Sequence, residues 1–268
     1  MNEVKIHTTL CTFMPIKTES SYCHTKIMIE TKISISESMR SALHLWTKHF
    51  VKIISVGFII YLPTQICIEL LSIWLDRALP IEDSSSILLM NNIYNLVRYL
   101  IGAVALLGII NFIMKVLNGE DEQNVSEIIL HGLNKWGKFI GLGLLAGLKI
   151  FLYSILLIIP GIYKSVRLAF IDCTIATSNN IFTDELDESE QLVENRWWKV
   201  FGFLLLLILL ELLFELIFVP LILYFESHIM SIAIGVVIKI FETYFIVVKA
   251  CYYFNLKKSR EAIKAITP

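Results

Sequence analysis

The sequence has too few charged residues for a soluble protein of its length. Only 18% of its 268 residues are Asp, Glu, Lys or Arg, whereas 56% are hydrophobic. Soluble domains usually carry about 25% charged residues, and one soluble core cannot absorb so large an apolar excess. The net charge of −1 gives no indication of a nucleic-acid partner.

The sequence also lacks the motifs that mark metal sites and hydrolases. Its six histidines form no HExxH motif, and it contains no GxSxG motif and no glycine-rich phosphate loop. The five cysteines are odd in number, widely spaced and without a CxxC pair, which argues against a zinc site and against a disulfide framework. We therefore expect no metal, no cofactor and no enzymatic activity.

The N-terminal segment lacks the apolar core of a cleavable signal peptide. Residues 1–33 are polar, whereas a signal peptide needs an apolar run of about 7–15 residues. We expect this segment to be disordered, and an alternative start at Met28, without residues 1–27, would cost no membrane helix. The remaining chain divides into a membrane domain at 34–256 and a short basic cytoplasmic tail at 257–268.

Long hydrophobic runs are what the sequence has instead. From residue 200 to residue 225 only Glu211 and Glu215 interrupt the apolar residues, and about 20 such residues cross a bilayer core ~30 Å thick. The same criterion predicts an all-α, polytopic transmembrane helical bundle with the lipid bilayer as its main partner. Its six predicted spans are 50–74, 93–117, 137–159, 161–177, 200–225 and 229–254.

The fourth span is the weakest of the six. Lys164, Arg167 and Asp172 lie inside it. It is included because Pro160 and Gly161 favour a tight reversal after the third span. With five spans, the C-terminus would lie on the other side of the membrane.

Basic residues near the span ends indicate the orientation, because cytoplasmic loops carry an excess of lysine and arginine. With six spans, most of these residues fall on one side. We therefore expect a multi-pass protein of the bacterial cytoplasmic membrane with both termini in the cytoplasm. The residues on that side are Lys48, Lys52, Lys115, Lys135, Lys138, Arg196, Lys199, Lys257, Lys258 and Arg260.

Three Trp-x-Lys segments precede the odd-numbered spans and indicate three divergent hairpin repeats. Each follows a helical stretch, at 34–45, 124–135 and 186–196, and each would begin with a short interfacial amphipathic helix. An indole prefers the headgroup region, and a nearby lysine reaches water, so the alternative is that any bilayer protein places these residues there. The expected interfacial anchors are Trp46, Lys48, Trp136, Lys138, Trp197, Trp198 and Lys199.

The first and third helical stretches differ in charge. In the first, Ile35, Met39 and Trp46 share one face, which we expect to lie in lipid. The third has acidic residues at 184, 185, 187, 188 and 190. We expect a solvated acidic face there, with a docking role as the alternative.

Small residues in the third span predict close helix packing. Gly137, Gly141, Gly143 and Gly147 have small-xxx-small spacing, which permits a neighbouring helix to approach closely.

Charged residues inside the spans are the best functional clue, because each costs at least ~2.5 kcal/mol in the bilayer unless it pairs or meets water. We expect a buried ion-pair cluster, which either holds the helices together or forms a polar pathway for an ion or a solute. Arg167 could hold a phosphate or a carboxylate, and the alternative is that it pairs with Asp172 or Glu215. The cluster contains Lys149, Arg167, Asp172, Glu211, Glu215, Lys239 and Glu242.

Four short segments carry a family resemblance: IPGIY at 159–163, VRLAF at 166–170, ES at 188–189 and RWWKVFG at 196–202. With them the sequence resembles a broad group of bacterial membrane proteins that includes the membrane domain of some glycerophosphoryl diester phosphodiesterases. The resemblance implies a six-helix membrane domain, mostly without an assigned activity. It does not imply phosphodiesterase chemistry, because the separate catalytic barrel needs about 250 residues. Lys164 and Asp172 depart from the pattern.

These observations leave three functional hypotheses. The first is a non-enzymatic accessory or scaffold protein of the bacterial cytoplasmic membrane, whose partner is another membrane protein or a second copy of this chain. The second is a transporter or channel-like protein that uses the intramembrane charges. The third, and weakest, is an enzyme acting on lipid through Asp172, Glu211 or Glu215.

Overall fold

The computed structural model describes residues 34–78, 84–120, 123–178, 184–224 and 228–266 of the chain. Every regular element within these ranges is an α-helix, which confirms the predicted all-α class. Residues 1–33, which we expected to be disordered, lie outside the described part of the chain. The helices are α2 (Ile35–Lys48), α3 (Phe50–Ala78), α4 (Ser84–Leu117), α5 (Val125–Leu156), α6 (Ile158–Arg167), α7 (Ile171–Thr177), α8 (Asp184–Val193), α9 (Trp197–Tyr224) and α10 (His228–Ile266).

Four of the helices are long and apolar enough to cross a membrane. The qualifying stretches are Phe50–Leu75 in α3, Leu88–Leu117 in α4, Val125–Leu156 in α5 and Trp197–Phe218 in α9. They correspond to the first, second, third and fifth predicted spans, and their apolar surfaces are compatible with an integral membrane protein. The predicted sixth span lies within α10, which also carries Lys239, Glu242 and Lys249.

The predicted fourth span is not one continuous helix. Residues 161–177 belong to two short helices, α6 and α7, with a turn between them at 168–170. The 10 residues of α6 extend only about 15 Å at 1.5 Å per residue, so α6 alone cannot cross a bilayer. The charges of this segment instead pair with α8 and α10.

The reversal after α5 lies slightly earlier than the sequence suggests. Leu157 is extended, with φ −164° and ψ 147°, and separates α5 from α6. Pro160 then lies in the first turn of α6, where its missing N–H is tolerated. A side chain at Gly161 would collide with Ser154 of α5, so the glycine lets the two helices pack closely.

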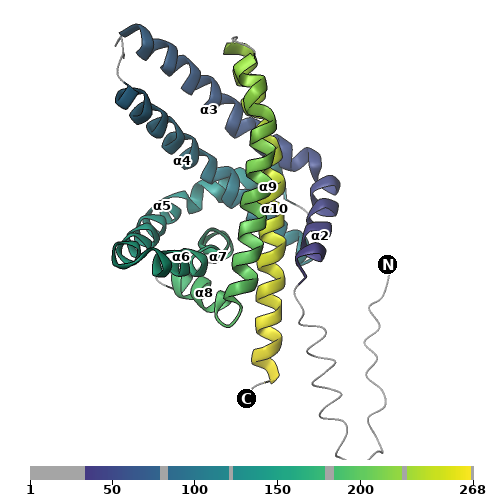
Figure 1. Cartoon of the computed structure of the whole chain (residues 1–268). Coiled ribbons are helices and arrows are strands. Elements are labelled where there is room, and N and C mark those ends of the chain that lie inside the picture. Colours follow the sequence, from purple (N-terminus) through teal and green to yellow (C-terminus); the bar gives the residue numbers. More distant parts are fainter. Residues whose placement is uncertain (1–33, 79–83, 121–122, 179–183, 225–227, 267–268) are drawn as a thin grey trace, which may run out of the picture.

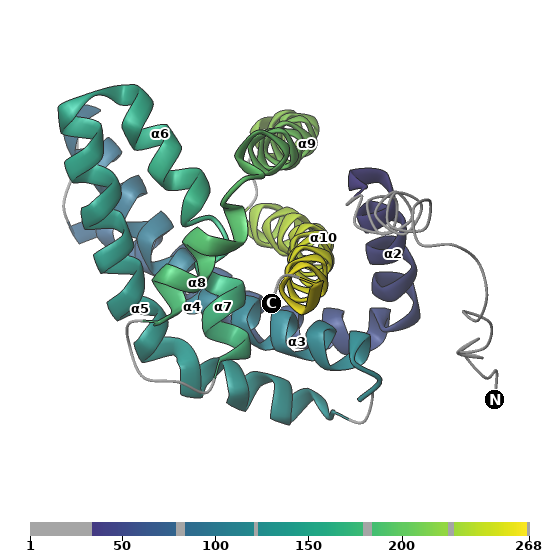
Figure 2. The same ribbon diagram turned by 90° about the horizontal axis from the view of Figure 1, so that it is seen from below.

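The helices cross at a marked angle and do not form a set of parallel hairpins. In Figure 1, α9 and α10 run side by side along the length of the molecule. Helices α3 and α4 extend away from this pair at one end, and α5 to α8 gather beside it at the other. Figure 2 shows α9 and α10 nearly end-on, whereas α5 is seen from its side. One end of the molecule is therefore built from α3, α4, α9 and α10, and the other also contains the short helices α6, α7 and α8.

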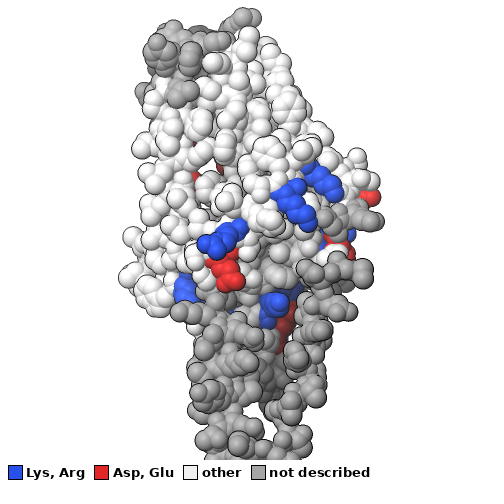
Figure 3. All heavy atoms as spheres, turned by 90° about the vertical axis from the view of Figure 1, so that its right-hand side faces the viewer, with Lys and Arg blue, Asp and Glu red and all other residues white. Residues whose placement is uncertain are grey.

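The core lies at the end where α4 packs against α7 and α10, with α8 against α7. The second half of α4 is buried there, and the fully buried core includes Phe112 of α4, Phe170 of the turn before α7 and Tyr253 of α10. The first half of α4 is largely exposed, for example at Leu96 and Tyr99. In Figure 3 the upper part of the surface shows no basic residue, and the Lys and Arg side chains gather lower down.

The three Trp-x-Lys segments lie in three different local structures. Trp46 and Lys48 end α2, Trp136 lies in the middle of α5, and Trp197 begins α9. The predicted interfacial stretch 124–135 is not a separate helix, because α5 runs unbroken from Val125 to Leu156. Among the described residues, the three segments of the predicted repeat therefore do not share one local structure.

The apolar face of α2 packs on protein, contrary to our expectation that it lies in lipid. Ala42 is fully buried, the indole Nε1 of Trp46 donates to Thr243 Oγ1 of α10 at 3.0 Å, and Asn255 Nδ2 donates to Ser38 Oγ at 3.0 Å. The long α10 supplies the apolar surface that α2 needs. Helix α10 continues to Ile266, so the predicted tail at 257–268 forms its last turns over the described residues.

The closest helix crossing is not at the predicted glycines. A side chain at Gly108 would collide with the carbonyl oxygen of Ile128, and one at Gly132 with that of Val104. At Gly143, in contrast, no described atom lies within 4 Å of where a Cβ would stand. Helices α4 and α5 therefore meet at Gly108 and Gly132, about one to two turns before the predicted stripe.

Candidate functional site

A cavity of about 420 Å³ lies between α3, α4, α9 and α10. It is at the apolar end of the molecule, where the first half of α4 diverges from the core (Figure 1). Apolar side chains such as Phe214 and Phe245 form part of its wall. Its polar lining consists of Tyr61, Thr64, Gln65, Asn95, Arg98, Tyr99, Glu211, Glu215, Lys239 and Glu242.

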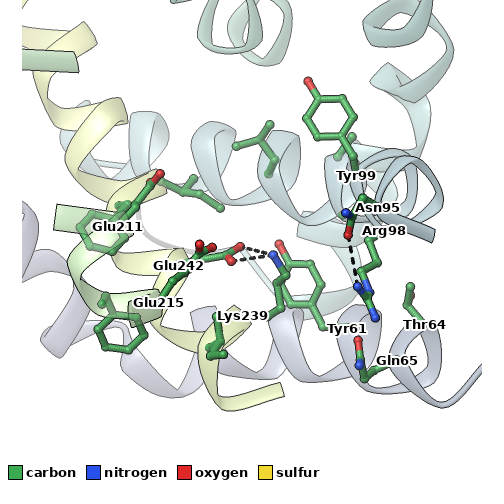
Figure 4. A pocket seen from close by; sticks show the side chains of 17 residues that line it. Tyr61, Thr64, Gln65, Asn95, Arg98, Tyr99, Glu211, Glu215, Lys239 and Glu242 are labelled. Carbon is green, nitrogen blue, oxygen red and sulfur yellow. Dashed lines mark hydrogen bonds and ion pairs between the residues drawn. The ribbon is translucent and has the colours of Figure 1, made fainter. Parts of the chain in front are cut away.

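Four of the seven predicted cluster residues meet in this cavity. Glu211 and Glu215 come from α9, and Lys239 and Glu242 come from α10. Lys239 Nζ donates to both carboxylate oxygens of Glu242, at 2.6 and 2.7 Å. Figure 4 shows the three carboxylates on one side of the cavity and the Arg98 guanidinium across from them.

Glu211 and Glu215 have no hydrogen bond or ion pair with any described residue. Glu211 is half-buried and Glu215 is exposed. Their spacing of four residues places both carboxylates on one face of α9, as the sequence predicts. The α9 wall therefore presents two acidic groups that the protein itself does not neutralise.

Arg98 is the charged residue of the cavity that the predicted cluster did not include. Its Nη1 donates to Asn95 Oδ1 at 3.2 Å, and its Nε has no hydrogen bond within the described part of the chain. The search for charges concentrated on the later four spans, whereas Arg98 lies in the second. Its position one turn after Asn95 in an otherwise apolar run was the available signal.

The cavity is acidic on balance. The carboxylates of Glu211, Glu215 and Glu242 face the basic groups of Lys239 and Arg98, which leaves one negative charge in excess when all are ionised. Apolar walls with a few converging polar groups are typical of small-molecule sites. The arrangement is therefore suited to a small cation with an apolar part.

The cavity ends at a closely packed layer between α4 and α10. Ile109, Phe112, Val247 and Val248 are each 0% exposed there.

Asp172 lies outside the cavity, in an ion pair of its own. It is 6% exposed on α7, and its Oδ2 accepts from Lys249 Nζ of α10 at 2.6 Å. Its Oδ1 also accepts from the backbone N–H of Cys173 at 2.9 Å. Lys249 was missing from the predicted cluster, although it lies within the predicted sixth span.

Arg167 pairs with a residue that the sequence analysis did not consider. Its Nη2 lies 3.6 Å from Glu190 Oε2 of α8, and Lys164 Nζ lies 2.6 Å from Glu190 Oε1. Arg167 forms no ion pair with either predicted partner, Asp172 or Glu215. Arg167 therefore faces α8 through Glu190, while its Nε has no hydrogen bond among the described residues.

The acidic helix α8 is not the solvated face that we expected. Glu185 is 1% exposed and accepts from Lys138 of α5 and from the Ser178 hydroxyl. Glu188 pairs with Lys257 of α10 at 3.1 Å, and Glu190 pairs with α6. The α8 carboxylates thus connect three other helices, because each faces a basic residue on a different neighbour.

The ionisation of Glu185 depends on this pairing. Burial by itself opposes the charged carboxylate, but the hydrogen bonds from Lys138 and Ser178 outweigh it and lower the pKa of Glu185 below its ordinary value. The carboxylate therefore stays ionised in the folded protein at neutral pH.

The remaining predicted cluster residue, Lys149, is not near the others. It is half-buried on α5, and α5 contributes no residue to the cavity. The structure therefore divides the single predicted cluster into the cavity group, the Asp172–Lys249 pair, the Arg167–Glu190 pair and Lys149.

Most of the predicted anchors contact protein. Trp136 Nε1 donates to the Leu100 carbonyl at 2.6 Å, and Trp197 Nε1 donates to the Tyr163 carbonyl at 3.2 Å. Lys138 pairs with Glu185. Trp198, at 77% exposure, keeps the surface position expected of an interfacial indole.

Within the described residues, no group of three or more His, Cys, Asp or Glu side chains is placed to hold a metal ion. The lining of the cavity offers ionic attraction and hydrogen bonding. Comparisons of the chain with protein-family models, with curated proteins and with solved structures give no match. The several apolar helices suggest a membrane location.

Proposed function

We propose that this chain is a multi-pass protein of a bacterial cytoplasmic membrane that binds and carries a small cationic solute in the cavity between α3, α4, α9 and α10. The observation that supports the proposal is the presence of Glu211 and Glu215 in that cavity without a partner among the described residues. Ionisable residues inside apolar membrane segments mark substrate or ion pathways when they are not used for pairing.

The unpaired carboxylates favour transport over internal stabilisation. Acidic residues that only hold helices together need a basic partner, since an isolated buried charge is costly. The Asp172–Lys249 and Lys239–Glu242 pairs meet that need. Glu211 and Glu215 do not, and a cation that enters the cavity would supply the missing charge.

The proposed orientation has both termini in the cytoplasm and six crossings. It requires α10 to cross and α6 and α7 together to return the chain to the cytoplasmic side. The basic residues at the charged end, including Lys138 and Lys257, support that assignment. Single cysteines at Ile159, in the exposed reversal between α5 and α6, and at Ser259 of α10 test it, because labelling of both from the same side of the membrane would contradict it.

Uptake by the purified protein in liposomes tests the proposed function. We would measure accumulation of tetraphenylphosphonium, choline, spermidine and ethidium, and repeat the measurement with the double variant Glu211→Gln/Glu215→Gln. We expect at least one cation to accumulate, and at least a tenfold loss in the double variant, because both uncompensated charges are gone.

Glu194→Gln is the matched control, because Glu194 is an exposed carboxylate that is not part of the cavity lining. We expect it to transport as the unmodified protein does. The proposal fails if none of the cations accumulates, or if the double variant keeps full uptake.

A non-enzymatic accessory role is the second candidate. The reversal between α5 and α6 presents a continuous apolar tip, with Leu156 at 78% and Ile159 at 79% exposure. A tip of this kind fits lipid or another membrane protein. If uptake is absent, retention of a specific membrane protein by the intact chain but not by an Ile159→Ser variant would support this role.

A further inference from the structure

A second cavity lies at the charged end of the molecule. Its volume is about 810 Å³, and it is lined by the last turns of α4 and the turn that follows, by α5, by α7 and by the last turns of α10. Its polar lining is rich in amide and basic groups. The polar residues are Asn111, Lys115, Asn118, Glu120, His131, Thr177, Lys257, Lys258 and Glu261.

Asn111 is the residue that points to a ligand. It is 7% exposed and lies between the fully buried Ile110 and Phe112. Its Nδ2 donor has no hydrogen bond among the described residues. A buried donor without an acceptor is destabilising, so an acceptor supplied by a ligand would relieve a penalty that the protein alone bears.

Two lysines in the same cavity also lack a partner. Lys115 and Lys258 form no ion pair with a described residue. Lys257, in contrast, is held by Glu188 at 3.1 Å and lies 5.9 Å from the centroid of the Tyr253 ring. The cavity therefore combines one fixed ammonium group with two that are free to meet an anion.

The other titratable lining groups do not reverse this charge. His131 Nε2 lies 2.8 Å from the carbonyl oxygen of Ala176 and therefore donates to it. The carboxylates of Glu120 and Glu261 are outnumbered by the three lysines of the lining. Glu188 offsets Lys257, so the formal charges balance, and an anion in the cavity would be held by the donors that have no partner, on Asn111, Lys115 and Lys258.

We propose that this second cavity binds a phosphate-bearing anion, with the Asn111 amide and the Lys115 and Lys258 ammonium groups as its donors. Lysine is a common phosphate ligand, and basic pockets between membrane helices bind the headgroups of anionic lipids. A cavity of about 810 Å³ exceeds what inorganic phosphate needs and has room for a phosphate ester. The source is either a lipid headgroup or a soluble phosphate.

This inference does not depend on the proposed transport function. The two cavities share no lining residue, although α4 and α10 contribute to both. Between them lies the closed layer that contains Phe112 and Val247. The Glu211→Gln/Glu215→Gln variant should therefore leave phosphate binding unchanged.

Ligand-induced stabilisation of the full chain in nanodiscs tests the site and its source. We would measure Tm in phosphatidylcholine nanodiscs with and without inorganic phosphate or phenyl phosphate, and again in nanodiscs that contain phosphatidylglycerol. A rise in Tm with either soluble phosphate assigns a soluble ligand, and a rise only with phosphatidylglycerol assigns a lipid headgroup.

Variants distinguish the cavity from general surface charge. We expect Lys115→Gln/Lys258→Gln to lower the affinity for the ligand that raises Tm at least tenfold. We expect Asn111→Leu to lower this affinity as well, while the unliganded protein stays folded, because leucine is of similar size and removes the unpaired donor. Lys264→Gln is the control, since Lys264 is an exposed residue of α10 that does not line the cavity. The proposal is overturned if no probe raises Tm, or if Lys264→Gln weakens the response as much as the double variant does.

Discussion

The two ends of the molecule treat their acidic residues in opposite ways. At the charged end, Glu185, Glu188 and Glu190 of α8 each contact a basic residue on a neighbouring helix. At the apolar end, Glu211 and Glu215 face a cavity and have no partner among the described residues. Glutamate residues thus hold helices together at one end of the molecule and have no partner among the described residues at the other.

The comparison teaches that the number of charges in a membrane segment does not reveal their role. Opposite charges balance in the sequence, which suggested mutual neutralisation throughout. In the structure, however, several basic residues of the predicted spans are used by α8, so the balance is not local. The carboxylates of α9 are left over because Lys164 and Arg167 pair with Glu190.

The largest effect is expected from the Asp172–Lys249 pair, which lies near the layer that closes the cavity. Replacing Lys249 by Met leaves the Asp172 carboxylate buried and unpaired, and removal of one partner of a buried pair costs about 3–5 kcal/mol. We expect a large fall in Tm in detergent, measured by the loss of monodisperse protein on heating.

The double variant Asp172→Leu/Lys249→Met sharpens this prediction. Because both charges are removed together, it should recover much of the stability lost in the single variant. Equal Tm values for the single and the double variant would show that the pair contributes through shape and not through charge.

An intermediate, pH-dependent effect is expected at Glu185. Its pKa is lowered in the folded protein, so on acidification the unfolded chain binds the proton first. The stability that this carboxylate contributes is fully present above the unfolded value of about 4.3, and it is lost as the pH falls through the folded pKa.

Tm measured from pH 7 down to pH 3 tests this sign. We expect Glu185→Gln to have a lower Tm than the unmodified protein at pH 7 and a smaller further loss in acid. The exposed Glu194→Gln serves again as the control. A pH profile for Glu185→Gln parallel to that of the unmodified protein would refute the assignment.

The smallest effect is expected at Glu211, and its sign separates the two ends. Glu211→Gln breaks no pair with a described residue, so it should leave Tm unchanged or raise it slightly. Glu190→Gln, which weakens two ion pairs, should lower Tm. A fall in Tm for Glu211→Gln as large as that for Glu190→Gln would erase the distinction between the two ends.

Several features of the fold follow from the sequence. The all-α class and the four long apolar helices are confirmed, because a hydrophobic run of sufficient length is a property of consecutive residues. The amphipathic pattern beginning at Ile35 correctly predicted a helix there. The shared face of Glu211 and Glu215 also follows from helix geometry alone.

Other features could not be read from the sequence because they depend on which helices are neighbours. Nothing local to Glu190 indicates that it meets both Lys164 and Arg167, and nothing local to Arg98 indicates that it faces α9 across a cavity. The break in the predicted fourth span likewise depends on partners in α8 and α10. The family resemblance and the six-span topology stay predictions.

By itself, then, the sequence determined that this chain is helical and where its long apolar helices lie, because both depend on short-range periodicity and composition. Only the tertiary structure decided which charges are paired, since an ion pair needs two side chains brought within a few ångströms from distant parts of the chain. That long-range arrangement leaves Glu211 and Glu215 facing one cavity and Asn111 and Lys115 facing another.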